Sequence, residues 1–77
     1  MRKQFVFTAT ASWVTDGITT DLPKVVSQAT ATVKRGHGDK SCGGVLTVNA
    51  PTQAKLTEAS EYITEHSLYG QHFKPKQ

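Results

Sequence analysis

Apolar and polar residues alternate over residues 4–14, and this pattern predicts a β-strand near the start of the chain. One face of the strand is aromatic or small, and the other face is mostly threonine. The positions on the first face, which we expect in the core, are Phe5, Phe7, Ala9, Ala11 and Trp13. Asp16-Gly17 follows directly and predicts a hairpin turn, because a type I′ turn needs positive φ at both central residues.

The segment 21–35 fits two patterns. As a helix, its apolar residues recur at three- and four-residue spacing, and Gly36 would end it. As a strand, small or branched residues alternate with polar ones from Ala29 to Lys34. Threonine and valine lose χ1 freedom in a helix and fit a pleated surface. We therefore expect a strand over about 26–35, and a second helix over 21–35 is the alternative.

A loop, a short strand and a helix follow in order. Residues 36–44 hold four glycines, which predicts a loop because ordering glycine costs backbone entropy. Val45–Val48 is a short apolar strand, and Asn49 is a candidate N-cap for a helix over 50–67. Gly70 would end that helix directly or after a frayed turn. The residues on its apolar face are Leu56, Ala59 and Ile63.

These patterns predict an α+β domain with a small three-stranded antiparallel sheet and one C-terminal helix packed on one face. We expect residues 1–70 to form a single compact domain and residues 71–77 to form a flexible basic tail. A chain of 77 residues buries roughly 60% of its surface, which leaves no room for a deep substrate cleft. Valines on the second sheet face predict pairing into a homodimer; they are Val6, Val14 and Val26.

Charge and glycine point to one candidate binding loop. The chain has nine Lys and Arg against six Asp and Glu, and the net charge of +3 comes from residues 1–40. Glycines let backbone N–H groups approach an anion, and neighbouring cations neutralise it. A solvated hairpin loop is the alternative interpretation, since the P-loop spacing is absent. The basic residues of the 34–40 loop are Lys34, Arg35, His37 and Lys40.

Several chemistries find no support in the sequence. Cys42 is the single cysteine, so no internal disulfide forms. The histidines and Cys42 lack the paired spacing of a structural zinc site, and we expect no metal and no cofactor. Cys42 and His37 form the one enzyme-like pair, but so small a chain cannot exclude water from them. No apolar run is long enough to cross a membrane, and we expect a cytoplasmic protein.

Aromatic residues near the C-terminus form a second candidate surface. Tyr69 and Phe73 lie beside His72 and Lys74, and exposed aromatics next to a cation are typical of protein-binding hot spots. Alternatively, Tyr69 and Phe73 fold back and close the open end of the sheet.

We therefore expect a small non-enzymatic protein-binding module. Its size and sheet-plus-helix pattern are similar to those of many small phage-encoded proteins, and this similarity implies an inhibitor that occludes a host protein. The alternative is a small basic nucleic-acid-binding protein that uses the 34–40 loop. The candidate binding residues are Lys34, Arg35, His37, Lys40, Tyr69, His72 and Phe73.

Overall fold

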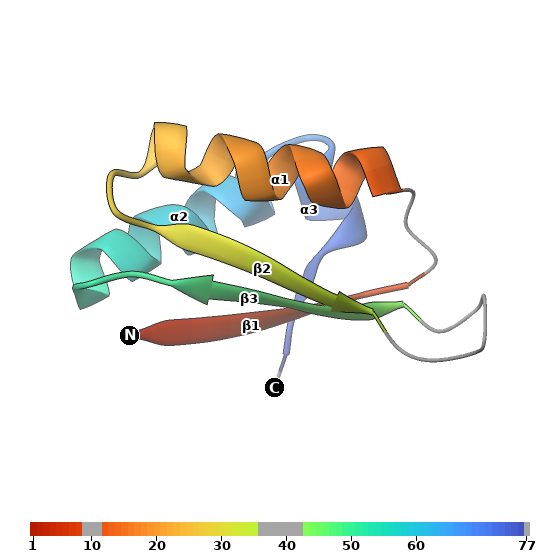
Figure 1. Cartoon of the computed structure of the whole chain (residues 1–77), viewed down its shortest axis with the longest axis horizontal. Coiled ribbons are helices and arrows are strands. Elements are labelled where there is room, and N and C mark those ends of the chain that lie inside the picture. The colour runs from red at the N-terminus through yellow and green to blue at the C-terminus, as the bar shows by residue number, and fades with distance from the viewer. Residues whose placement is uncertain (9–11, 36–42, 77) are drawn as a thin grey trace.

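A computed structural model describes residues 1–8, 12–35 and 43–76 of the chain. Within these ranges, helices cover one face of an antiparallel sheet, and the opposite face carries none (Figure 1). The sheet has four strands in the order β2-β3-β1-β4. The elements are β1 (Arg2–Phe7), α1 (Ser12–Val25), β2 (Thr30–Arg35), β3 (Gly44–Asn49), α2 (Gln53–Glu65), α3 (Tyr69–His72) and β4 (Lys74–Pro75).

The chain order and the strand order together define two split β-α-β units. β1 and β2 are both antiparallel to β3, so they run parallel to each other with β3 between them. In the same way, β1 separates β3 from β4. The molecule is thus an α+β domain of two layers, a topology in which each helix links two parallel strands that are not neighbours.

The core lies between the sheet and the helices. Phe5 and Leu46 are fully buried on the helix-facing side of the sheet and are paired in register. Each long helix contributes a stripe of buried residues with three- to four-residue spacing. The buried apolar residues of α1 are Val14, Ile18 and Leu22. Those of α2 are Leu56, Ala59 and Ile63, as predicted for that helix.

The strand expected over residues 4–14 is confirmed as far as Phe7, and the strand and hairpin are wrong from Ser12 onward. The expected core positions Ala9 and Ala11 lie outside the described residues. Residues 12–25 form α1, because the spacing of its buried apolar residues matches the helical period and places all of them on the sheet. Gly17 lies inside this helix, where an added Cβ would come within 3.0 Å of the Tyr69 hydroxyl oxygen. Trp13 is 65% exposed and does not belong to the core. Val14 and Val26 are buried, so neither forms a second sheet face.

The later elements follow the predictions more closely. The strand expected over 26–35 is confirmed for Thr30–Arg35, and the strand at Val45–Val48 lies within β3. The predicted C-terminal helix is confirmed as α2, with two corrections at its ends. Thr52 caps α2 in place of Asn49, because its hydroxyl accepts a hydrogen bond from the Lys55 amide at 3.2 Å.

The other end of α2 also differs from the expectation. The helix ends at Glu65, two residues before the expected end at residue 67, and Gly70 lies inside α3. A Cβ on Gly70 would lie 2.5 Å from the carbonyl oxygen of Thr64, so a glycine there lets α3 pack closely against α2. The predicted loop over 36–44 falls mostly on residues 36–42, which lie outside the described residues.

The fourth strand comes from the C-terminal segment, and the prediction of three strands and one helix is corrected accordingly. β4 pairs with β1, and the Lys76 amide donates a hydrogen bond to the Gln4 carbonyl oxygen at 3.0 Å. Phe73 precedes β4 and is buried, with its ring 5.5 Å from that of Phe7. Part of the segment expected as a tail therefore extends the sheet. Across the described part of the chain, no helix has the length and apolar character needed to cross a membrane.

Candidate functional site

The face of the sheet that points away from the helices, the open face, is covered by no helix among the described residues (Figure 1). Phe5 and Phe7 point into the core, so strand alternation places their neighbours in β1 on the open face. The strand register arranges these positions in three rows across the sheet. The rows are Lys34, Val45, Val6 and Lys74; Thr32, Thr47, Gln4 and Lys76; and Thr30, Asn49 and Arg2.

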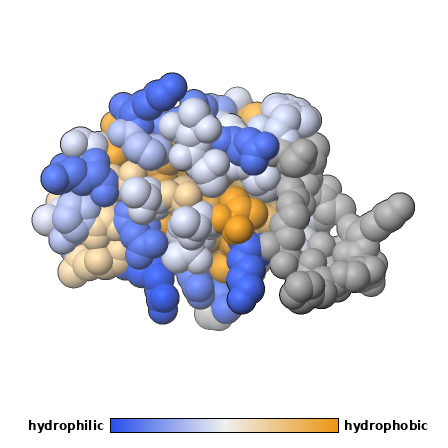
Figure 2. Space-filling model, viewed as in Figure 1, coloured by the Kyte–Doolittle hydropathy of each residue, from blue (hydrophilic) through white to orange (hydrophobic). Residues whose placement is uncertain are grey.

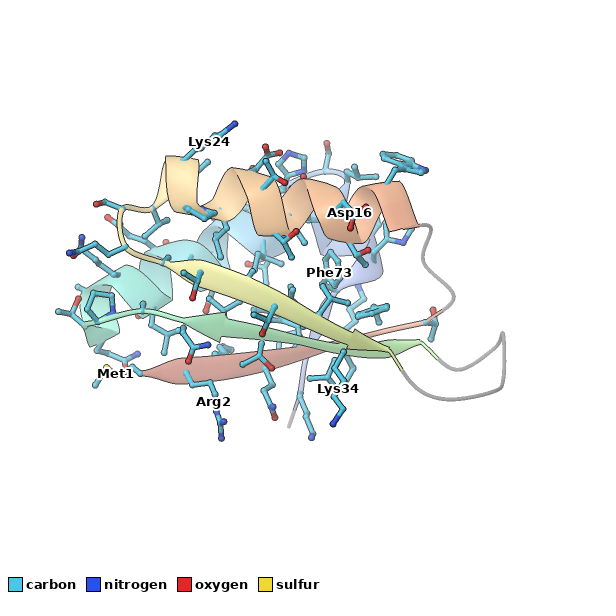
Figure 3. All side chains as sticks on the ribbon, viewed as in Figure 1. Met1, Arg2, Asp16, Lys24, Lys34 and Phe73 are labelled. Atoms are coloured by element: carbon cyan, nitrogen blue, oxygen red, sulfur yellow. The ribbon has the colours of Figure 1, made fainter. Side chains whose placement is uncertain are left out.

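Cations border this face. Arg2 and Lys34 project from the side of the sheet opposite the helices, whereas Asp16 and Lys24 lie on α1 (Figure 3). Figure 2 shows strongly hydrophilic residues along the same lower border of the molecule. None of the described residues of the open face is acidic. The carboxylates in the described ranges lie on the two long helices, at Asp16, Asp21, Glu58, Glu61 and Glu65.

The centre of the open face is uncharged. Val6 and Val45 pair across β1 and β3, and Val6 is 38% exposed. In the next row, the Gln4 Nε2 atom donates to the Thr47 Oγ1 atom at 3.5 Å. Lys34 and Lys74 flank the valine pair about 14 Å apart, three strand spacings across the sheet. The two lysines therefore lie at opposite edges of the uncharged centre.

A cavity of about 290 Å³ adjoins one edge of the open face. Val6 and Lys74 belong to both the cavity and the open face, so the two features are continuous. The lining residues are Val6, Phe7, Thr8, Gln71, His72 and Lys74.

The structure separates the residues that the sequence suggested for binding. Lys34 lies on the open face, and Arg35 is the last residue of β2. His37 and Lys40 lie outside the described residues. His72 is half-buried in the wall of the cavity.

Tyr69 and Phe73 are both buried, and their rings lie 6.2 Å apart. Both rings therefore lie in the core, as in the alternative in which the C-terminal aromatics fold back against the sheet, and they form no part of the exposed open face. The Tyr69 hydroxyl donates to the Asp21 Oδ2 atom at 3.0 Å and so joins α3 to α1. His66 stacks on the Tyr69 ring at 4.3 Å, and its Nδ1 atom accepts a hydrogen bond from the Leu68 amide.

This environment predicts a loss of stability in alkali. Burial, together with the hydrogen bond to Asp21, raises the pKa of Tyr69 from 10.0 to about 12. The folded state therefore holds the phenolic proton that the unfolded chain releases above pH 10. We expect the free energy of unfolding to be unaffected by this group below pH 10 and to fall as the pH rises toward 12.

The measurement is urea denaturation followed by circular dichroism, at intervals from about pH 9 to about pH 12. Tyr69→Phe should flatten the decline over that range and cost about 1 kcal/mol at neutral pH through the lost hydrogen bond. Tyr62→Phe is the matched control, since it leaves the hydrogen bond between Tyr69 and Asp21 in place, and it should retain most of the decline. An unchanged decline in Tyr69→Phe would show that other groups cause it.

Sequence reasoning placed Val6 on the second sheet face but missed most of the cations that border this face. Arg2 and Gln4 share the face with Val6 by alternation. Lys74 and Lys76 join it only because β4 returns to β1. The described residues contain no group of three or more His, Cys, Asp or Glu side chains that could hold a metal ion.

Comparison of the chain with protein-family models, with curated proteins and with solved structures finds no match.

Proposed function

We propose that the protein is a small non-enzymatic protein-binding module that places the open face of its sheet on an acidic surface of a partner protein. The observation that carries the proposal is the distribution of charge on this face. Its uncharged centre is bordered by Lys34 at one edge and by Lys74 and Lys76 at the other. None of the described residues of this face carries a carboxylate. Protein interfaces combine a centre depleted of charge with a polar rim in this way.

The electrostatics of the two layers support the same partner. Cations lie at the rim of the open face and the described carboxylates lie on the helices, so an acidic surface is attracted to the sheet and repelled by the acidic side of the helices. The charges thereby orient the protein, with its open face toward the partner, before the two surfaces touch. A bound domain of this size covers the partner's acidic surface, so we propose that it acts as an inhibitor by occlusion, in the cytoplasm.

Nucleic acid is the second candidate, because the charged residues described on the open face, Arg2, Lys34, Lys74 and Lys76, are all cations. Phosphate contacts from four cations give a salt-dependent affinity with a slope of about 3 in log K against log salt. Binders of single strands add aromatic side chains on which bases stack. The described part of the open face has no aromatic residue, and this favours a protein partner.

The test compares two exposed lysines on opposite layers. The wild-type protein, Lys34→Glu and Lys24→Glu are immobilised and exposed to lysate of the source organism, with and without nuclease treatment. Both variants change the net charge equally, but Lys34 lies on the open face and Lys24 lies on α1. Lys34→Glu should slow association and reduce capture of the partner by about three- to tenfold, whereas Lys24→Glu should stay within about twofold of wild type.

Two results would contradict the proposal. Equal loss of capture in both variants would show that the open face is not the interface. Loss of all capture after nuclease treatment, with low-micromolar and salt-steep binding to an oligonucleotide, would establish the nucleic-acid function instead.

A further inference from the structure

The cavity beside the open face has an apolar floor and a charged rim. Val6 and Phe7 from the end of β1 form the apolar part of its lining. The other side comes from the segment around α3 and β4, and Lys74 lies directly opposite Val6 in the strand register. The Lys74 side chain therefore lines the cavity beside its apolar residues.

The cavity is large enough to hold one large apolar side chain. Its volume is about 290 Å³, whereas a cavity of about 150 Å³ suffices to bind benzene. The floor is preformed, because the Phe7 ring packs edge-on against the buried Phe73 ring at 5.5 Å. Little reorganisation is then needed to admit a side chain, and a preformed pocket that takes an anchor residue is typical of an interface hot spot.

The charge at the rim selects the group that neighbours the apolar side chain. The Lys74 Nζ atom donates one hydrogen bond to the Gly70 carbonyl oxygen at 3.3 Å, and an ammonium group has three donors. Lys74 can therefore also donate to a carboxylate, and none of the described lining residues is acidic and would compete for it.

We infer that this cavity receives an apolar side chain of the acidic partner protein, with a carboxylate next to that side chain bound by Lys74. The inference rests on the proposed function and names the recognition element that the partner supplies, a leucine- or phenylalanine-sized residue adjacent to Asp or Glu. The open face then supplies the broad contact, and the cavity fixes its position.

Short peptides test the inference without the partner. The 15N-labelled full chain is titrated with acetyl-Asp-Leu-Asp-amide, and amide shifts are followed by NMR. Two matched probes replace either the leucine with alanine or both aspartates with lysine. The acidic leucine peptide should bind in the millimolar range, at least about fivefold more tightly than either control. Its shifts should be confined to the cavity residues Val6, Thr8, Gln71, His72 and Lys74.

Variants separate the two parts of the site. Lys74→Met keeps an apolar stem and removes the charge, so it should erase most of the preference for the acidic over the basic peptide. Gln71→Trp places a large ring at an exposed position of α3 and should abolish the shifts by filling the cavity. Lys24→Met is the control and should bind like wild type. The dispersion of the amide spectrum verifies that each variant is folded.

Equal binding of all three peptides, shifts centred away from the cavity, or no shifts at about 10 mM peptide would each overturn the inference. These outcomes are independent of the capture experiment. Capture that depends on Lys34 while the peptides leave the cavity untouched overturns this inference and keeps the proposed function. Peptide binding in the cavity, together with capture that does not depend on Lys34, keeps this inference and overturns the proposed function.

Discussion

Replacing Phe73 with alanine should lower the free energy of unfolding by about 3–5 kcal/mol. The Phe73 side chain is 1% exposed, and its ring packs against those of Phe7 and Tyr69. Truncation leaves a cavity at the point where α3 and β4 join the core. A domain of this size has a stability of only about 5 kcal/mol, so at the upper end of this loss about half of the variant should be unfolded at 25 °C.

Trp13→Ala is the matched control for this loss of an aromatic ring. Its side chain is 65% exposed, and its removal should change stability by less than about 1 kcal/mol. Urea denaturation followed by circular dichroism measures both variants. If Phe73→Ala unfolds at the same urea concentration as wild type, then the C-terminal segment contributes nothing to the core and the four-stranded description fails.

Gly43→Ala should be at least as disruptive, with a loss of about 3 kcal/mol or more. Gly43 comes directly before β3, where the Phe7–Gly44 pair ends the ladder between β1 and β3. A Cβ at Gly43 would lie 1.4 Å from the Phe7 carbonyl oxygen and 2.6 Å from the Thr8 Cα atom. Both are backbone atoms, so no side-chain rotation relieves the clash and the two chain segments must separate.

Gly17→Ala is the comparison, because a Cβ at Gly17 would also lie close to a neighbouring residue. The neighbouring atom there is the hydroxyl oxygen of a side chain, Tyr69, at 3.0 Å, and it can give way by a small shift. Alanine is also favoured over glycine inside a helix by about 1 kcal/mol, so we expect a net change within about 1 kcal/mol. Hydrogen exchange of the β1 and β3 amides should show lost protection in Gly43→Ala alone. Wild-type protection in that variant would contradict the tight contact between the two segments.

The sequence predicted β3 and α2 because the residue pattern of each lies within one short segment. The α+β class followed from these local patterns. The prediction failed at α1 because two periods overlap there. The alternation that marks β1 continues as far as Trp13, while the helical stripe of Val14, Ile18 and Leu22 becomes evident only over a longer window. Asp16-Gly17 strengthened the wrong choice, since a turn signal does not reveal that tertiary packing accommodates a glycine inside a helix.

The candidate site was less predictable than the fold. Lys34 was identified because it is near other cations in the sequence, but its neighbours across the sheet come from strands far away in the chain. The aromatic residues Tyr69 and Phe73 stand among polar residues, and their burial depends on α3 folding onto the core. Exposure of an aromatic side chain is a property of tertiary packing, which local composition does not encode.

The central position of β1 has a consequence for how the chain folds. The N-terminal ammonium group of Met1 donates to the carbonyl oxygen of Ala50 at 2.7 Å, a contact across 49 positions in the sequence. Both strands that flank β1 come later, from Gly44 onward, so a nascent chain that lacks them has a first strand without any partner. Large loops must close before any strand pairs with β1, and this requirement slows folding. Until then the backbone groups of β1 stay unpaired and can promote aggregation. Early folding therefore depends on α1 and β2, which are adjacent in the chain and contact each other directly.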